Sequence, residues 1–429
     1  MLALEVIHEG SDPTRPNRAF ITLWQERLSM SETFRFDYQP GALLYGEAII
    51  DELGTELARH DLNRALVVCG ETVGGTEPVV GPVREGPGER LAGLFDRMSA
   101  NKYLSTAVEG AERVQSEDID VLIGLGAGSS LDTTKLISVL AGHDQAPAGP
   151  VREMVKDGTV HLPSGDLLPI VAIPTTLAGA DMSTVAGTRL TLDPDTPDEE
   201  IEGVGVSDSR LTPLAGFYDP SLFEHTPTPV LTGSAMNGFD KGIEMLYGRD
   251  HTAITDATAA HGVRLLRRSL LTLDDDSPAF DDIVRGIMLV QYGLSTSSAY
   301  RASLIHAFGH GFSRGYDVTQ GVVHAILAPH VLSYLFEQVD GRRELLAGAF
   351  GVDTSARSHA ELADAIVDEF TAVRDGMGLP TRLRSIDGLE REDFPSIVET
   401  ILADSFMQNI PEGLNPAPEE INGVLRTAW

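Results

Sequence analysis

Cysteine, lysine and long apolar runs are scarce in this 429-residue chain. Its only cysteine, Cys69, stands in the apolar run 65–69. The chain therefore forms no internal disulfide, and Cys69 is expected to be a small core residue of a protein from a reducing compartment. No run of about 18 apolar residues is present that could cross a bilayer. We therefore predict a cytoplasmic protein without a membrane partner.

Basic residues are also few, because 32 lysines and arginines stand against 64 aspartates and glutamates, for a formal net charge of −32. Only four of the basic residues are lysines. Such a surface would repel a polyanion, so a nucleic-acid partner is excluded. It also repels itself unless salt screens its charges. We interpret the chain as halophilic, with an ordinary acidic protein as the alternative.

Residues 1–31 lack the pattern of a signal peptide, because no clean apolar segment separates a basic start from a small-residue cleavage site. We predict an N-terminal extension. It is either a disordered arm or a stretch that precedes a true start at Met30.

Short apolar runs alternate with helical stretches from residue 32 to 215, the range predicted as the first domain. The runs are rich in β-branched residues and bounded by Gly or Pro, which is typical of buried parallel strands. They cover residues 65–69, 121–125 and 168–173. Helical periodicity covers residues 49–59, 88–98, 107–116 and 130–141. The alternation predicts an α/β domain with a parallel sheet, in which the acidic stretch 193–200 is a solvated hairpin tip.

Helical patterns dominate residues 216–429, the range predicted as a second, all-α domain. The expected helices cover residues 230–247, 257–270, 283–298, 303–312, 322–336, 360–377 and 395–409.

A glycine-rich turn, Gly124-Leu-Gly126-Ala-Gly128-Ser129, follows one apolar run and opens a helix. Glycines let the backbone approach a ligand, and the amides at a helix N-terminus favour a pyrophosphate. A second loop with hydroxyl groups follows the next run, so both loops are expected at the carboxyl edge of the sheet. The residues predicted to bind a dinucleotide are Gly126, Ala127, Gly128, Ser129, Asp132, Thr175 and Thr176.

Two histidines, His306 and His310, are one helical turn apart and precede a polar loop. Residues at i and i+4 share a helix face, so one imidazole can bind while the other donates a proton. The alternative is a pair of structural histidines. Arg314 and His324 are candidates for binding a substrate carboxylate, whereas Tyr316 and Asp317 are expected to shape the turn.

The motif Gly126-Ala-Gly128-Ser129-Ser-Leu-Asp132 is similar to the Gly-Gly-Gly-Ser-x-x-Asp loop of the iron-containing alcohol dehydrogenase superfamily. Asp219-Pro220, Gly378-Leu-Pro-Thr381 and Asn415-Pro416 resemble further landmarks of that family, from about residue 34 to the C-terminus. The loop 174–183 is more similar to that of maleylacetate reductases, a branch of the superfamily. The resemblance implies an NAD(P)-binding α/β domain, a C-terminal helical domain like that of dehydroquinate synthase, and an active site between them.

The resemblance also implies an iron or zinc site, built from Asp-x-x-x-His on one helix and two later histidines. The matching positions hold Asn237, Lys241, His306 and Gln320. An ammonium group among the ligands would repel a dication. We therefore expect a site without metal, in which Lys241 polarises the substrate oxygen or forms a plain salt bridge.

A second alignment, shifted by three residues, leaves a metal possible. It replaces the first pair with Asp240 and Glu244, which together with His306 and Gln320 could hold a divalent ion. In that case Lys241 would be only a surface lysine.

His310 matches the superfamily histidine near the nicotinamide, which implies that it exchanges the alcohol proton. Gly70 stands where NAD-selective members often have an acidic residue, so we favour NADP over NAD, although Glu71 could reverse that preference. We predict an NAD(P)-dependent alcohol dehydrogenase or carbonyl reductase, a homo-oligomer, acting on a small alcohol, aldehyde or ketone. The alternatives are a lyase that uses nicotinamide internally and a non-catalytic nucleotide-binding protein.

Overall fold

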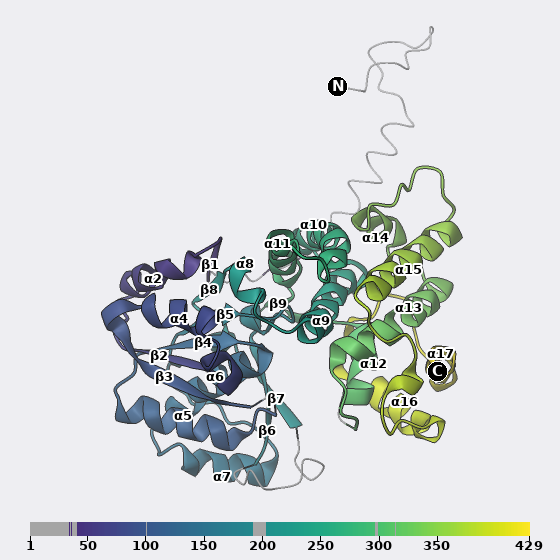
Figure 1. Ribbon diagram of the computed structural model, residues 1–429. Helices are drawn as coiled ribbons and strands as arrows, with labels where there is room; N and C mark the ends of the chain where they lie inside the picture. Colours follow the sequence, from purple (N-terminus) through teal and green to yellow (C-terminus); the bar gives the residue numbers. More distant parts are fainter. Residues whose placement is uncertain are drawn as a thin grey trace, which may run out of the picture. The chain divides into compact units, whose positions relative to one another are not determined.

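A computed structural model describes residues 34, 36, 41–99, 101–191, 203–296, 299–313 and 315–429 (Figure 1). The predictions for residues 1–31, for a start at Met30, for the tip at 193–200 and for Arg314 lie outside the described residues. All elements named below belong to the compact unit Tyr38–Trp429.

Six parallel strands form the sheet of the first half, in the order β1-β8-β5-β4-β2-β3. Their bounds are β1 Ala42–Tyr45, β2 Ala65–Gly70, β3 Leu91–Met98, β4 Val121–Gly126, β5 Ile170–Pro174 and β8 Ala215–Tyr218. The three predicted strands correspond to β2, β4 and β5. Every residue of β4 and β5 is buried, because helices cover both faces of the sheet. The predicted parallel α/β layer is confirmed.

Alternate residues of each central strand face opposite cores. Leu66, Val68 and Leu122 pack in one cluster with helices α5, α6 and α7. Val67 and Cys69 pack in the other with α2 and α4, so the expected core position of Cys69 is confirmed. The helices of this half are α2 Leu53–Arg59, α3 Glu71–Gly74, α4 Glu77–Glu85, α5 Leu104–Ser116, α6 Gly128–Ala141 and α7 Ala148–Asp157.

The predicted helix at 88–98 is wrong. A short 3-10 turn, Gly88–Arg90, leads instead into the edge strand β3, which pairs with β2. Leu91, Leu94, Phe95 and Met98 repeat at i, i+3, i+4 and i+7, which mimics a helical stripe. Backbone pairing with β2 overrides that local pattern.

Two antiparallel strands, β6 Val185–Arg189 and β7 Gly203–Ser207, lie on either side of the stretch 193–200 in the chain, in agreement with the hairpin predicted there. Strand β6 packs on α6.

Helices make up almost all of the second half, as predicted. They are α8 Pro220–Phe223, α9 Thr228–Tyr247, α10 Ala253–Ser269, α11 Phe280–Gln291, α12 Leu304–Ser313, α13 Gln320–Gln338, α14 Arg343–Ala349, α15 His359–Gly376, α16 Phe394–Ala403 and α17 Pro418–Ala428. The predicted helix 283–298 ends early, since Gly293 adopts a φ of 85° and the short strand β9 Ser295–Thr296 follows. Helices α8, α14 and α17 were not predicted.

The predicted helix 395–409 is interrupted at Asp404, whose Oδ1 accepts a hydrogen bond from the Phe406 amide and caps the 3-10 helix η9 Ser405–Asn409.

Helices α9 and α13 approach closely at Gly233 and Gly321. A Cβ on Gly321 would lie only 1.8 Å from the Gly233 carbonyl oxygen. Only glycine fits there, and the contact brings later turns of the two helices together.

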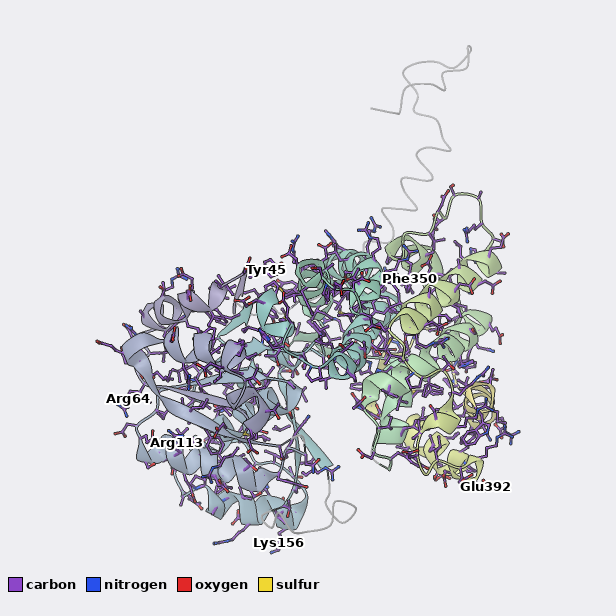
Figure 2. All side chains as sticks on the ribbon, in the orientation of Figure 1. Tyr45, Arg64, Arg113, Lys156, Phe350 and Glu392 are labelled. Carbon is purple, nitrogen blue, oxygen red and sulfur yellow. The ribbon has the colours of Figure 1, made fainter. Side chains whose placement is uncertain are left out.

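Charged side chains such as Arg64, Lys156 and Glu392 extend outward from exposed positions (Figure 2). Among the described residues, none of the helices combines the length and apolar character needed to span a membrane.

Candidate active site

The predicted nucleotide loop connects β4 to α6. Gly126 adopts a φ of 126°, and a Cβ there would lie 3.1 Å from Ser130 Oγ, so glycine is required. Ala127 is the N-cap residue of α6, and no side chain caps this helix. The amides of the first turn around Gly128 and Ser129 are therefore available to an anion.

The second predicted loop is bonded directly to the first. The Thr175 amide donates to the Gly126 carbonyl over 3.1 Å. Thr175 and Thr176 are both buried. Since β4 and β5 are neighbours in the sheet, the structure brings the two predicted loops together at its carboxyl edge.

Asp132 and Gly70 were also predicted to bind the cofactor, and the structure gives each of them other neighbours. The Oδ2 atom of Asp132 accepts hydrogen bonds from Lys102 Nζ at 2.7 Å and from the Gly187 amide at 3.2 Å, so this carboxylate fastens the β6–β7 hairpin to α6. Gly70 ends β2 and is the N-cap residue of α3, next to the exposed Glu71.

Lys135, which the sequence analysis did not single out, holds the second loop in place. Its buried Nζ donates to the carbonyls of Ala180, Ser183 and Val185 at 2.7, 2.7 and 3.0 Å. Burial lowers the pKa of Lys135 to about 8, against attraction from nearby carboxylates. The signal in the sequence was a rare lysine within an apolar helix.

The second loop also contacts the helical half. Lys241 Nζ donates to the Ala178 carbonyl at 2.5 Å, and Gln291 Nε2 donates to the same oxygen at 3.3 Å. The Leu177 amide donates to Ser234 Oγ at 3.2 Å. Lys241 is buried, so the expectation of a surface lysine is wrong.

His310 is oriented by a carboxylate that the sequence analysis missed. Its Nδ1 atom lies 2.8 Å from Asp404 Oδ2, and its ring lies 4.9 Å from that of Phe406. A ring nitrogen beside a carboxylate carries the hydrogen, so Nε2 is the atom left for proton exchange. An acidic residue directly after an apolar helix was the available signal.

His306 is held by Glu244. Its Nδ1 lies 2.5 Å from Glu244 Oε2, and its amide donates to Glu244 Oε1 over 3.0 Å. Tyr247 donates to the same Oε1 at 3.2 Å. On the other side of the ring, His306 Nε2 lies 3.2 Å from Asn237 Oδ1. All of the Glu244 contacts are buried.

Asp240, His306 and His324 form a buried cluster whose donor atoms lie within 4.8 Å of one another. His306 Nδ1 is 3.9 Å from Asp240 Oδ1, and His324 Nδ1 lies against Asp240 Oδ2. Although they touch, His324 and Asp240 lack hydrogen-bond geometry, and both oxygens of Asp240 and both ring nitrogens of His324 have no hydrogen-bond partner. Burial lowers the pKa of His324 to about 3, so its imidazole is neutral.

This cluster fits a divalent cation. A carboxylate and two imidazoles are ligands of zinc and of ferrous iron, and buried polar atoms without partners are costly. Of the four positions implied by the family resemblance, only His306 belongs to the cluster; Asn237 touches His306, Lys241 points to Ala178, and Gln320 begins α13. His324, assigned from the sequence to a substrate carboxylate, is instead fully buried beside Asp240.

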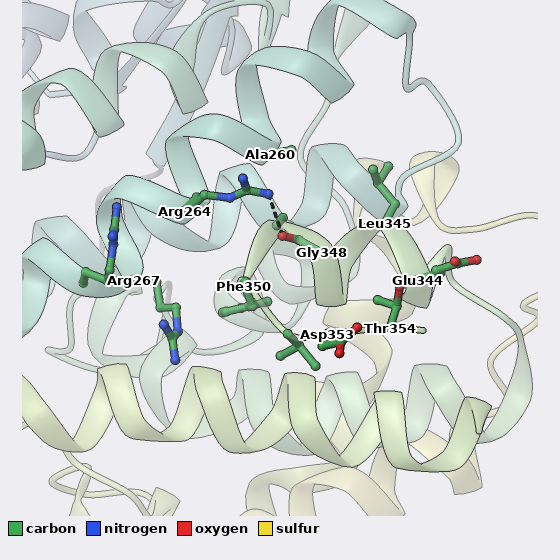
Figure 3. Close-up of a pocket in the computed structure, with 13 residues that line it drawn as sticks. Ala260, Arg264, Arg267, Glu344, Leu345, Gly348, Phe350, Asp353 and Thr354 are labelled. Atoms are coloured by element: carbon green, nitrogen blue, oxygen red, sulfur yellow. Dashed lines mark hydrogen bonds between the residues drawn. The ribbon is translucent and has the colours of Figure 1, made fainter. Parts of the chain in front are cut away.

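A separate cavity of about 950 Å³ lies between α10, α14 and the segment that follows α14 (Figure 3). Two of its arginines are engaged within the protein, since Arg264 donates to the Gly348 carbonyl and Arg267 pairs with Glu369. None of the residues of the nucleotide loops or of the histidine cluster lines this cavity.

Comparisons with known proteins show the family of this chain. The family model of iron-containing alcohol dehydrogenases matches residues 40–220, and that of the family's C-terminal region matches residues 232–429. The lactaldehyde reductase of Escherichia coli K12 is 26% identical over 391 residues, which are 90% of this chain and 97% of that protein. The maleylacetate reductase of Pseudomonas knackmussii is 25% identical over 411 residues, 92% of this chain and 97% of that protein.

Solved structures share the fold of this chain. The sulfoacetaldehyde reductase of Bifidobacterium kashiwanohense in complex with NAD+ superposes with a TM-score of 0.76 at 17% identity, over 92% of this chain and 99% of that one. The family models and the curated relatives show that the protein is an oxidoreductase that acts on alcohols or aldehydes. It belongs to the iron-containing alcohol dehydrogenase family, as the sequence motifs predicted. These relatives favour neither the lyase nor the non-catalytic alternative.

Proposed function

We propose that this protein transfers hydride between the nicotinamide of NAD(P) and a small alcohol, aldehyde or ketone, with His310 as the proton carrier. The observation that supports the proposal most strongly is a chain of contacts. The second nucleotide loop is bonded to α9 through Lys241, α9 contacts His306 of α12 through Asn237, and His310 follows one turn later on α12.

The nucleotide would lie on the two joined loops. The first turn of α6 would receive the pyrophosphate, while Gly126 allows its backbone to approach. Thr175 and Thr176 would line the same edge. We keep the preference for NADP, because Gly70 carries no carboxylate to repel a 2′-phosphate.

His310 would pass the proton between the substrate oxygen and solvent through Nε2, since Nδ1 is engaged by Asp404. The sequence assigned Lys241 a catalytic role as well. Because its Nζ donates to the Ala178 carbonyl, we propose that Lys241 positions the second loop.

A divalent cation is proposed as the second cofactor, held by residues of the Asp240, His306 and His324 cluster. When bound, such a cation supplies Lewis-acid polarisation of a substrate oxygen. Glu244 would keep the His306 ring oriented by its hydrogen bond to Nδ1.

The remaining proposals concern the setting of the enzyme. We propose a nucleotide-binding domain at 32–215 and a helical domain at 216–429, assembled as a homo-oligomer in a halophilic cytoplasm. The net charge of −32 supports adaptation to salt. The melting temperature is expected to rise from low to molar KCl, because salt screens the repulsion between the carboxylates; an unchanged value would contradict this.

Turnover measurements test the function. Oxidation of NADH and NADPH would be followed in molar KCl with 2-hydroxyaldehydes, simple aldehydes and oxo-acids. The variant His310→Ala is expected to lower kcat by about 10²–10⁴-fold while nucleotide binding persists. Bound nucleotide without turnover for any carbonyl would favour the non-catalytic alternative, and product formation without net oxidation of the nucleotide would favour the lyase.

A further inference from the structure

The buried cluster differs from the family-equivalent positions by a regular displacement along two helices. On α9, Asp240 and Glu244 repeat the i, i+4 spacing of Asn237 and Lys241, three residues further along. Three residues correspond to a rotation of about 60° around the helix and an advance of about 4.5 Å. On α13, His324 lies four residues, one full turn, beyond Gln320. His306 is common to both sets.

We infer that this protein binds a divalent cation through Asp240, His306 and His324. Asp240 and His324 each lie about one helical turn beyond a family-equivalent position, whereas His306 keeps its own. The inference rests on the proposed function and adds the class of ion and the displacement of the ligands along α9 and α13. The donor set of one carboxylate and two imidazoles suits ferrous iron, zinc or cobalt.

The chemistry of the donor groups explains why the ligands would shift. Lys241 occupies a family-equivalent ligand position, but an ammonium group has no lone pair to offer a dication, and its Nζ is bonded to the Ala178 carbonyl. Asn237 and Gln320 bring no negative charge to offset that of the dication. The displaced set supplies Asp240 as a ligand, with Glu244 as a second carboxylate against His306. A carboxylate bonded to the second nitrogen of a histidine is the usual support of a metal ligand.

Packing also makes room for the displaced set. A Cβ on Gly309 would lie 2.1 Å from His324 Nε2, so the absence of a side chain there accommodates the imidazole. The Gly233 and Gly321 contact holds α9 and α13 close enough for Asp240 and His324 to meet.

The buried contact between Asp240 and His324 has a competing explanation, namely a proton that the two side chains share. It would need a hydrogen bond between the two side chains, yet they are in contact without that geometry, and all four of their polar atoms lack partners. A cation would satisfy one atom of each residue together with His306. Because the Asp240 and His324 side chains are fully buried, we expect the ion to exchange slowly with chelators.

The test measures metal content in the full-length protein, produced in medium supplemented in turn with iron, zinc or cobalt. The wild type should contain stoichiometric metal. The near-isosteric Asp240→Asn and His324→Gln should each lower the bound metal by about tenfold or more. The matched control Gln320→Ala, on the same helix as His324, and the control Asp387→Asn, at an exposed position, should retain it.

Two further readouts separate ligand loss from misfolding. The visible spectrum of the cobalt-loaded protein should change in Asp240→Asn and His324→Gln but not in the controls. Nucleotide affinity, measured by NADPH fluorescence, should be the same in all four variants if the α/β half is intact. If His324→Gln loses both metal and nucleotide binding, that variant is unfolded. The cobalt spectrum of Asp240→Asn then decides whether the cluster binds the metal.

Other results would overturn the inference. Loss of metal in Gln320→Ala with retention in His324→Gln would return the site to the family-equivalent positions. A wild type free of metal after growth in each supplemented medium would support the shared proton. Turnover by that metal-free protein would leave the proposed function standing, whereas stoichiometric metal without turnover would contradict the function and leave the metal site.

Discussion

The two loops proposed to bind the nucleotide and the α9–α12–α13 cluster proposed to bind a cation are built from different parts of the chain. The loops present backbone amides, and each follows a buried strand of one sheet. The cluster presents side chains from three helices, and Asp240, His306 and His324 are far apart in sequence. The loop motif keeps its family spacing with one glycine changed to Ala127, whereas most family-equivalent ligands have been replaced.

The physical lesson is that the two kinds of site tolerate change differently. A backbone site depends on φ angles and close approach, so Gly126 cannot be exchanged for another residue without strain. A side-chain site depends only on donor atoms that converge, and a helix offers another pair at i, i+4 after a small rotation. The helical site can therefore move within the fold while the loop cannot.

The largest effect is expected from Asp404→Asn, which tests how the helical half positions His310. Asp404 Oδ1 accepts from the Phe406 amide and Oδ2 faces His310. Asparagine can keep the first bond, but it turns an amide N–H toward His310 Nδ1 and so reverses the tautomer. We expect kcat to fall by about 100-fold with KM nearly unchanged.

Steady-state kinetics with NADPH would measure this effect, with the exposed Asp387→Asn as the control. Full activity in Asp404→Asn would show that His310 does not depend on this carboxylate. Melting temperatures of the two variants should agree, since the cap of η9 remains.

The next effect concerns the anchor of the second loop. Lys135→Met removes three hydrogen bonds to buried carbonyls, so the free energy of unfolding should fall by about 3 kcal/mol. Denaturant unfolding in high salt would measure it. Lys156→Met, at an exposed position, should change it little.

The pH dependence of the unfolding free energy is a second test of the role of Lys135. Burial lowers the pKa of Lys135 to about 8 from an ordinary value of 10.5, so the unfolded chain binds this proton more tightly. The contribution of Lys135 to the unfolding free energy should therefore rise with pH between about 8 and 10.5. A wild-type slope equal to that of Lys135→Met across this window would contradict the lowered pKa.

A smaller effect is expected from Gly126→Val, which disturbs the first loop and leaves the helical cluster unchanged. The φ of 126° and the nearby Ser130 Oγ strain any side chain, at a cost of about 1–3 kcal/mol. Affinity for NADPH should fall by about tenfold or more, while metal content stays at the wild-type level. Gly348→Ala, where a Cβ would meet nothing within 4 Å, is the control for binding. Equal affinity in both variants would argue against this loop as the nucleotide site.

The smallest effect is expected at Cys69. Burial, with a further contribution from Asp96, raises the pKa of its thiol to about 12, so the reactive thiolate is rare at neutral pH. A disulfide reagent should leave the native protein unlabelled at pH 8 and label one thiol after unfolding. Rapid labelling of the native protein would show that the β2 core opens readily.

The family, the order of an α/β half and a helical half, and the meeting of the two loops at the carboxyl edge of the sheet were determined by the sequence alone. These features depend on local signals, namely β-branched runs, glycines at turns and residues spaced along one segment. Neighbouring parallel strands then bring their carboxyl-end loops together without further information.

Only the tertiary structure decided that 91–98 is a strand, that Lys241 is buried against Ala178, that Asp404 orients His310, and that His324 meets Asp240. Each depends on partners distant in the chain, such as the pairing of β3 with β2 and the close approach of α9 to α13. Periodicity shows which residues share a helix face, but the packing of helices decides which face meets which. For that reason the shift from Asn237, Lys241 and Gln320 to Asp240 and His324 could not be settled from spacing alone.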